Sequence, residues 1–223
     1  MTDGPIKCNF IAQEDIWSIV DDFRNHYWPS NVLPVDIEKI IEIGLKMEII
    51  PEHYIRQYAK IDAFIRSDFT GIIVDYDQYM DSMGRYEKRL RFSFAHEIGH
   101  YILHRHVYEE LHFESPREYA DFVLNMPESE HRKFEWQANE FAGRLLVPRS
   151  NLHEEIQKVY HKLKENSLLA ILKEEPEQVL ESVAPTLAKP FLVSDDVIVK
   201  RVERENLWPP KSGEESKHKE NLL

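Results

Sequence analysis

Five consecutive residues, His96-Glu97-Ile98-Gly99-His100, could carry out metal chemistry. On a helix, residues i and i+4 lie on the same face one turn apart, so the two imidazoles can bind one ion. Glu97 stands beside them, where its carboxylate can take a proton from a water that attacks a carbonyl carbon. The H-E-x-x-H pattern therefore predicts one Zn²⁺ per chain, held by His96 and His100, with Glu97 as the general base.

The flanks of this motif strengthen the prediction. The pattern fixes only three positions, and a chain with 11 histidines can produce it by chance. The neighbouring residues are apolar nearly all round the helix: Phe92, Phe94, Ala95, Ile98, Ile102 and Leu103. Polar groups on such a buried helix lose hydration unless a partner satisfies them, and a bound cation does so directly. The alternative is a polar cluster that is satisfied within the core.

A zinc site also needs a third protein ligand. His106 has the spacing of a longer histidine motif, but Leu103 replaces the glycine that lets the chain leave the helix there. His104 lies about 6 Å further along the helix axis than His100. We therefore expect His104 to support a ligand or to cap the helix.

Glu135 is the preferred third ligand. One face of a predicted helix over residues 131–147 carries Glu135, Ala138, Asn139 and Ala142. Its alanines permit a close approach to Gly99, while Asn139 can hydrogen-bond a ligating histidine. Glu140 is the competing ligand, but it projects away from this face.

Two segments together resemble the ImmA/IrrE family of zinc peptidases. The family carries A-H-E-[IL]-G-H followed by E-x-x-A-N-x-F-A-x-x-L-L-x-P, which appear here at residues 95–100 and 135–148. The likeness covers roughly residues 30–150. It implies a gluzincin-like metallopeptidase with His96, His100 and Glu135 as ligands and Glu97 as the catalytic residue.

The resemblance also implies a fold and a partner. The fold is α+β and zincin-like, mainly helical, with a small antiparallel β-sheet or hairpin before the metal-binding helix. An extended substrate is expected along the edge of the hairpin. Members of the family cleave a helix-turn-helix transcriptional repressor at a specific site, which makes such an anti-repressor role the expectation here.

Hydrophobic periodicity predicts the elements around the motif. Helices are expected at residues 14–23, 36–43, 86–105, 117–125, 131–147 and 151–165. Gly44 is expected to end the second of these in the left-handed conformation. Residues 47–50 should form a strand, and residues 60–66 and 71–76 a β-hairpin. The acidic, aromatic stretch 107–130 is expected to cover the site or alter substrate choice.

Three regions follow from these elements. We expect a zincin-like metallopeptidase domain over residues 1–150, a helical C-terminal extension over 151–210 and a disordered tail over 211–223. A single cysteine, Cys8, excludes an intramolecular disulfide. The N-terminus lacks a signal-peptide pattern, and no apolar run approaches the ~18 residues that span a bilayer. The expected location is cytoplasmic, without membrane association.

Two other kinds of function remain open. One is a metal-bearing sensor or scaffold that binds a transcriptional regulator without cutting it. The other is DNA binding through residues 187–201, which loosely resemble a helix-turn-helix, but Leu192 replaces the usual turn glycine and Pro190 interrupts the first helix. The formal net charge of −12 also works against direct binding of nucleic acid. Candidate oxyanion donors are His104, His112, Tyr101 and Tyr119.

Overall fold

The computed structural model describes residues 7–30, 32–108, 113 and 115–210, which form two compact units. The first comprises the chain up to Pro148 together with Pro190–Val193. The second comprises Arg149–Lys189 and the chain from Ser194 onward. His112 and the tail predicted at residues 211–223 lie outside the described residues.

Helices make up most of the first unit. They are α1 (Gln13–Tyr27), α2 (Ile37–Lys39) with a π-helical turn η1 (Ile40–Gly44), α3 (Ile55–Ala59), α4 (Tyr76–Tyr79), α5 (Glu87–Leu103), α6 (Arg105–Tyr108), α7 (Pro116–Asn125) and α8 (Glu128–Leu146). The helices predicted at residues 14–23, 86–105, 117–125 and 131–147 are therefore confirmed as α1, α5, α7 and α8, with differences of a few residues at their ends.

The sheet has three strands, β1 (Glu48–Glu52), β2 (Ala63–Ile65) and β3 (Gly71–Asp75), in the order β1-β3-β2. The predicted hairpin is confirmed, because β2 pairs antiparallel with β3. β1 also pairs with β3, but in parallel. The sheet is thus mixed, and the prediction of an antiparallel sheet is wrong for this strand. The alternation of side chains identifies a strand but not the direction of its neighbour, which depends on the crossover through α3 and β2.

The backbone conformation of Gly44 also differs from the prediction. It lies inside the π-helical turn, and the positive φ angle, 57°, belongs to Lys46 instead. A Cβ atom added at Gly44 would come within 2.8 Å of Cδ1 of Tyr27. The glycine is needed there because the end of α1 packs against it closely, not because the backbone is left-handed.

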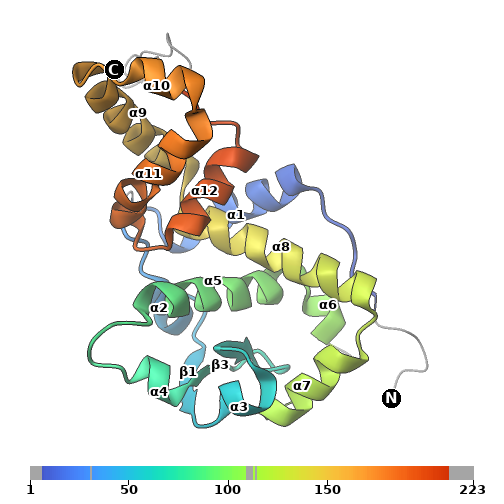
Figure 1. Ribbon diagram of the computed structural model, residues 1–223. Helices are drawn as coiled ribbons and strands as arrows, with labels where there is room; N and C mark the ends of the chain where they lie inside the picture. Colours follow the sequence, from blue (N-terminus) through green and yellow to red (C-terminus); the bar gives the residue numbers. More distant parts are fainter. Residues whose placement is uncertain (1–6, 31, 109–112, 114, 211–223) are drawn as a thin grey trace. The chain divides into compact units, whose positions relative to one another are not determined.

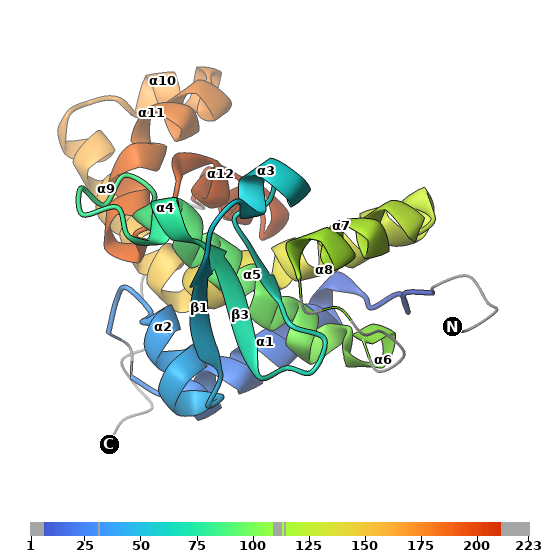
Figure 2. The same ribbon diagram turned by 90° about the horizontal axis from the view of Figure 1, so that it is seen from below.

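Helix α5 lies between the sheet and α8, as two views show (Figures 1 and 2). A Cβ atom on Gly99 would come within 3.1 Å of Cα of Ala138 and within 3.1 Å of Cβ of Phe141. The predicted packing of the small-residue face of α8 on Gly99 is therefore confirmed. Close approach of the two helices brings α8 side chains to the face of α5 that carries the motif.

The stretch 107–130 contributes an aromatic cluster within the first unit. Helix α7 begins with a capping box, in which Ser115 accepts from the Glu118 backbone N–H and the Glu118 side chain accepts from the Ser115 N–H. Five rings contact one another in a buried layer: Tyr108, Phe113, Tyr119, Phe122 and Phe134. This layer extends from α6 and α7 to α8.

The described part of the second unit consists of α9 (Arg149–Glu165), α10 (Leu169–Glu174), α11 (Pro176–Ala188) and α12 (Asp195–Arg204). The helix predicted at residues 151–165 is confirmed as α9. Arg201 forms a buried ion pair with Glu205, and Arg149 Nε lies 3.2 Å from the other oxygen of Glu205. α11 packs against both α12 and α9.

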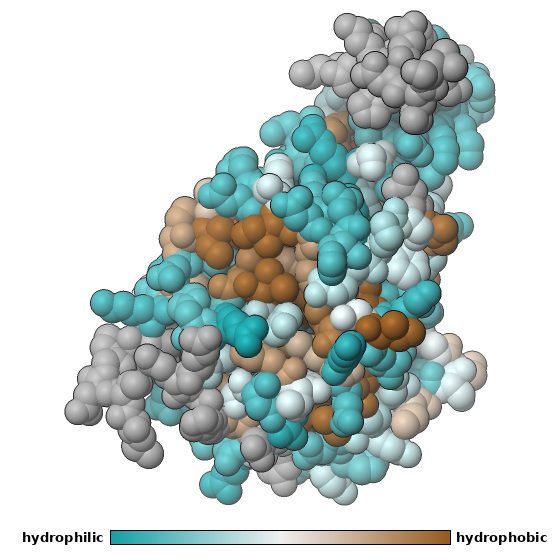
Figure 3. Space-filling model, turned by 180° about the vertical axis from the view of Figure 1, so that it is seen from behind, coloured by the Kyte–Doolittle hydropathy of each residue, from teal (hydrophilic) through white to brown (hydrophobic). Residues whose placement is uncertain are grey.

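The surface is mixed in character. Figure 3 shows apolar residues of one face in patches between polar ones. The most exposed large apolar side chains of the described residues are Leu124, Met83 and Phe10, which come from separate elements or segments. Within the described parts of the chain, no helix is long and apolar enough to cross a membrane.

Candidate metal centre

Helix α5 places His96 and His100 one turn apart, with their Nε2 atoms 2.8 Å from each other. The apolar residues between and around them hold this part of the helix in the core, where Ala95 and Ile98 are fully buried. His100 is also fully buried, whereas the His96 side chain retains 14% of its exposure. The two imidazoles thus meet at one point that solvent reaches from the side of His96.

Glu135 reaches this point from α8. Its Oε2 lies 3.4 Å from Nε2 of His96, and its Oε1 lies 3.6 Å from Nε2 of His100. Ligand atoms about 2.0–2.2 Å from a tetrahedral zinc ion are roughly 3.3–3.6 Å apart. The Glu135 oxygens already lie at this distance from the two nitrogens. The nitrogens themselves, now 2.8 Å apart, would have to separate by roughly 0.5–0.8 Å around an ion. The donor set, two imidazoles and one carboxylate, fits zinc.

Glu97 lies beside the same point and is 3% exposed. It offers a carboxylate oxygen within 4.8 Å of the ligand nitrogens of His96 and His100. Its Oε2 accepts the backbone N–H of Ile65 at 2.8 Å. Burial raises the pKa of Glu97 to about 7, with Glu135 adding to the rise and His96 and the Ile65 N–H opposing it. A bound cation would lower this pKa, because it favours the carboxylate.

The β2 strand can reach Glu97 because it is the edge of the sheet. In an antiparallel pair, alternate residues direct their backbone groups toward the neighbouring strand. The flanking residues Asp62 and Arg66 bond to β3 through their backbone oxygen and nitrogen, respectively. Ile65 therefore directs its N–H away from β3, toward α5. The hairpin and the motif helix are connected at the Glu97 carboxylate.

Asn139 contacts the other nitrogen of His96. Its Oδ1 lies 3.1 Å from His96 Nδ1, as predicted for a residue one turn after Glu135. Burial lowers the pKa of His96, but the hydrogen bond and charge of Glu135, aided by Glu97 and Asn139, outweigh it and raise the pKa overall. The pKa of Glu135 is lowered, because His96 outweighs its burial. Without a metal, His96 and Glu135 therefore behave as an ion pair.

His100 has a different environment from His96. The Phe134 ring stacks on it with centroids 4.1 Å apart, and His104 Nδ1 lies 2.9 Å from His100 Nδ1. Burial, together with the neighbouring histidines, holds the pKa of His100 well below its usual value. Burial also lowers the pKa of His104 to about 4. Both rings are therefore neutral near pH 7, the state in which imidazole binds metals.

The competing ligands lie elsewhere. Glu140 is fully buried and accepts a hydrogen bond from Trp17 Nε1 at 2.6 Å. His104 caps the end of α5 and contacts His100 rather than the shared point. His106 is exposed on α6. The structure thus brings Glu135 to both histidines and directs Glu140 to α1, as the helical spacing predicted.

Sequence reasoning missed two residues near the centre. His131 Nε2 lies 3.9 Å from Glu135 Oε1, one turn earlier on α8, and its i, i+4 spacing was a usable signal. Tyr108 is fully buried near His100, with ring centroids 6.3 Å apart. Its contact arises from tertiary packing, for which the sequence carries no local signal.

The described oxyanion candidates differ in position. Tyr119 is 5% exposed, and its ring stacks on Phe64 of β2 at 4.9 Å. Burial raises the pKa of Tyr119, and the charges of Glu97 and Glu135 add to the rise. Tyr101 instead packs against Phe69 at 5.2 Å. Tyr119 therefore lies against the strand whose Ile65 N–H bonds to Glu97.

Comparison with known families agrees with this geometry. A model of the IrrE N-terminal-like domain of peptidase family M78 matches residues 85–203, more than half of the chain. The chain belongs to this peptidase family. The resemblance to ImmA/IrrE peptidases and the mainly helical α+β fold are thereby confirmed. No curated protein matches the chain.

Membership in the IrrE-like family identifies a peptidase of a metal-dependent class. The matched residues include α5 and α8, which contribute all four residues of the candidate centre, and extend through most of the second unit. The β2 strand, whose Ile65 contacts Glu97, precedes the match. The contact between the sheet edge and Glu97 is therefore visible only in the structure, because β2 lies outside the residues that the family model matches.

Proposed function

We propose that this IrrE-like peptidase is a zinc-dependent endopeptidase whose centre consists of His96, His100, Glu135 and Glu97. The observation that carries the proposal is the placement of the Glu135 oxygens 3.4 and 3.6 Å from the two Nε2 atoms of another helix. A buried carboxylate that could serve as a base adjoins them. Two helices contribute to one small cluster of neutral and anionic donors, which is what a divalent cation requires.

Zinc at this centre would supply Lewis acidity, polarising a peptide carbonyl and making water nucleophilic at neutral pH. Glu97 Oε2 is held by the Ile65 N–H, which leaves Oε1 to receive the proton of the attacking water. Glu97 then gives this proton to the leaving amine nitrogen. Asn139 accepts from His96 Nδ1–H, which keeps the lone pair of His96 Nε2 directed at the shared point.

The proposed substrate is an extended segment of a regulatory protein, such as a helix-turn-helix repressor. The resemblance to the family supports the repressor, and the position of β2 at the edge of the sheet supports the extended conformation. Ala63 precedes Ile65 by two residues, so its backbone groups also face away from β3. A peptide that adds to this edge passes beside Glu97.

The proposal includes the organisation of the chain. Residues 1–150 would form the metallopeptidase domain, and residues 151–210 a helical extension to it. All residues of the candidate centre lie in the first unit, whose boundary is at Pro148. The second unit would then serve in recognition or regulation rather than in chemistry.

The decisive experiment compares the wild-type chain with Glu97→Gln, both loaded with zinc, on a repressor encoded beside its gene. We expect the wild type to cleave the repressor and a chelator to abolish cleavage. Glu97→Gln should lose at least about 10²–10⁴-fold in rate while it retains the metal. Glu87→Gln is the matched control, because Glu87 is exposed at the start of the same helix.

The same experiment separates peptidase from scaffold. A scaffold or sensor would bind the repressor equally well as wild type and as Glu97→Gln, and it would cut neither. Cleavage that survives both the substitution and the chelator would contradict the proposed centre.

Direct DNA binding has less support. Leu192 has a φ of 54° in the turn before α12, a conformation that costs a leucine more than the usual glycine. Helix α12 begins with Asp195 and Asp196, whose charges would repel phosphates at the helix start that usually enters the groove. Arg201 is buried in its ion pair with Glu205. DNA affinity that falls steeply with salt would favour this alternative.

A further inference from the structure

A chain of hydrogen bonds leads from His100 to the N-terminal segment. His100 Nδ1 lies 2.9 Å from His104 Nδ1, and His104 Nε2 lies 3.1 Å from Gln137 Oε1. Gln137 Nε2 donates to the backbone oxygen of Asn9 at 2.9 Å. The side chains of His100, His104 and Gln137 belong to fully buried residues.

The last bond determines the direction of all the others. A backbone carbonyl can only accept, so the amide nitrogen of Gln137 must face Asn9. Gln137 Oε1 then faces His104 and can only accept, which places the proton of neutral His104 on Nε2. His104 Nδ1 consequently presents a lone pair to His100, which must carry its own proton on Nδ1. The remaining nitrogen of His100, Nε2, is left as a lone pair.

Nε2 is the His100 nitrogen that faces His96 and Glu135. We propose that His104 and Gln137 are positioning residues, which hold His100 in the tautomer that can bind a metal, with the Asn9 carbonyl as their anchor. This inference rests on the proposed zinc centre. It adds a role for two residues that touch neither the ion nor the substrate.

The opposite proton arrangement would be incompatible with the metal. If His104 carried its proton on Nδ1, His100 Nδ1 would have to accept it. The proton of His100 would then lie on Nε2, where it would block coordination. His104 Nε2 would also direct a lone pair at Gln137 Oε1, and two buried acceptors would face each other. The chain of hydrogen bonds therefore favours one tautomer at both rings.

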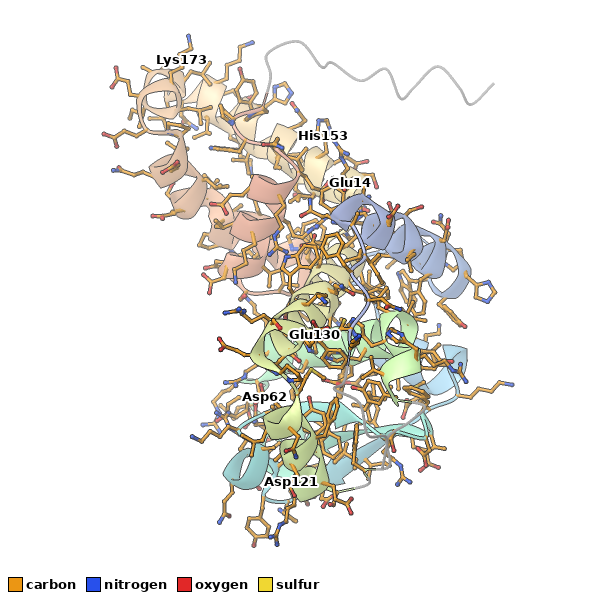
Figure 4. The ribbon with its side chains drawn as sticks, turned by 90° about the vertical axis from the view of Figure 1, so that its right-hand side faces the viewer. Glu14, Asp62, Asp121, Glu130, His153 and Lys173 are labelled. Carbon is orange, nitrogen blue, oxygen red and sulfur yellow. The ribbon has the colours of Figure 1, made fainter. Side chains whose placement is uncertain are left out.

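The anchor is itself held in place. The Cys8 backbone N–H donates to Glu130 Oε2 at 2.8 Å, and Lys133 Nζ donates to the Cys8 oxygen at 2.8 Å. Glu130 lies on α8 and is labelled in Figure 4. Glu130, Lys133 and Gln137 are spaced by three and four residues, so one face of α8 binds the segment before α1. The Asn9 carbonyl is thus oriented by contacts on the residue that precedes it.

Two substitutions of His104 separate the hydrogen bond from the shape of the ring. His104→Phe preserves the stacking on Phe134, where the ring centroids are now 4.3 Å apart, but it removes the acceptor. His104→Asn loses the ring, but its Oδ1 can occupy the place of Nδ1 and accept from His100. His161→Phe, at an exposed position of α9, is the matched control. Zinc affinity is measured by competition with a chelator, and folding by thermal unfolding of the metal-free chains.

We expect His104→Phe to lower zinc affinity by about 10–100-fold, and His104→Asn to retain more affinity than His104→Phe. Gln137→Met, which keeps the volume but removes both polar atoms, should also weaken binding. A loss in His104→Asn equal to or greater than that in His104→Phe would overturn the inference, since ring packing would then be the cause.

The tautomers of His100 and His104 can be measured directly, and ring packing alone would not change them. In the zinc-loaded wild type, long-range ¹H–¹⁵N correlation spectra should show His104 protonated at Nε2 and His100 protonated at Nδ1. A proton on His104 Nδ1 would overturn the inference while leaving the zinc centre intact. A wild-type chain that binds no zinc would overturn the proposed function, and this inference with it.

Discussion

Gly99 of α5 and Ala138 of α8 approach so closely that a Cβ atom on the glycine would lie 3.1 Å from Cα and 3.2 Å from the oxygen of Ala138. This contact sets the separation of the helices that contribute His100 and Glu135. The proposed metal centre therefore depends on a residue that has no functional group.

Replacing Gly99 with larger residues should reduce stability and zinc affinity, and a larger side chain should reduce both more. Alanine is the better helix former by about 1 kcal/mol, but the crowding it causes costs roughly 1–3 kcal/mol, so Gly99→Ala should be mildly destabilised. Gly99→Val should lose more stability and bind zinc more weakly, because α8 must move outward. Chemical unfolding and chelator competition measure the two effects. Ser93→Ala, on another face of α5, is the control, and unchanged zinc affinity in Gly99→Val would contradict the prediction.

Glu135→Gln and Glu140→Gln should affect different properties. Glu135→Gln removes the anionic ligand and should lower zinc affinity by at least about tenfold. Glu140→Gln changes a buried side chain bonded to Trp17 and should reduce stability while leaving zinc affinity unchanged. Isothermal titration and thermal unfolding of both variants provide the comparison. A greater loss of zinc from Glu140→Gln would make Glu140 the ligand.

Zinc affinity should fall as the pH is lowered through neutrality. His96 has a raised pKa and the pKa of Glu97 is about 7 in the metal-free chain, so both hold protons that a cation must displace. Below about pH 7 the logarithm of the affinity should rise with pH, and it should level off once both groups are deprotonated. Affinity measured from pH 5.5 to 9 in one buffer series tests this dependence, and a flat profile would contradict it.

The pKa shifts of His96 and Glu135 predict how the stability of the metal-free chain depends on pH. The folded pKa of His96 is raised, so its contribution is fully present below its unfolded pKa of about 6.5 and is lost as the pH rises through the folded value. The folded pKa of Glu135 is lowered, so its contribution is present above about pH 4.5 and is lost as the pH falls. Their ion pair should thus stabilise the metal-free chain most between these limits. A His96→Ala, Glu135→Ala double-mutant cycle across this range measures the coupling.

Tyr119→Phe should slow cleavage without releasing zinc. Tyr119 is buried against Phe64 of β2, the strand whose Ile65 N–H bonds to Glu97. Burial raises its pKa, and the charges of Glu97 and Glu135 add to the rise. Loss of an oxyanion donor costs about 10²–10³-fold in kcat. Tyr101→Phe is the control, because Tyr101 packs on Phe69 instead. Equal kcat values for the two variants would exclude Tyr119 from this role.

Much of the candidate centre could be predicted from local patterns. The spacing of His96 and His100 and the position of Glu97 between them follow from the geometry of one helix. The face shared by Glu135 and Asn139 follows from the geometry of another. The small residues at Gly99 and Ala138 further indicated that these helices touch, because close packing requires the absence of bulky side chains at both positions.

Only the tertiary structure decided what surrounds those residues. The parallel pairing of β1, the Ile65 N–H on Glu97 and the hydrogen bonds from His104 to Asn9 join residues distant in sequence. A helical or strand period reports which side of an element is buried, but it does not report which element covers that side. The sequence alone therefore determined the proposed ligands and the proposed base, whereas long-range packing determined the partners that orient them.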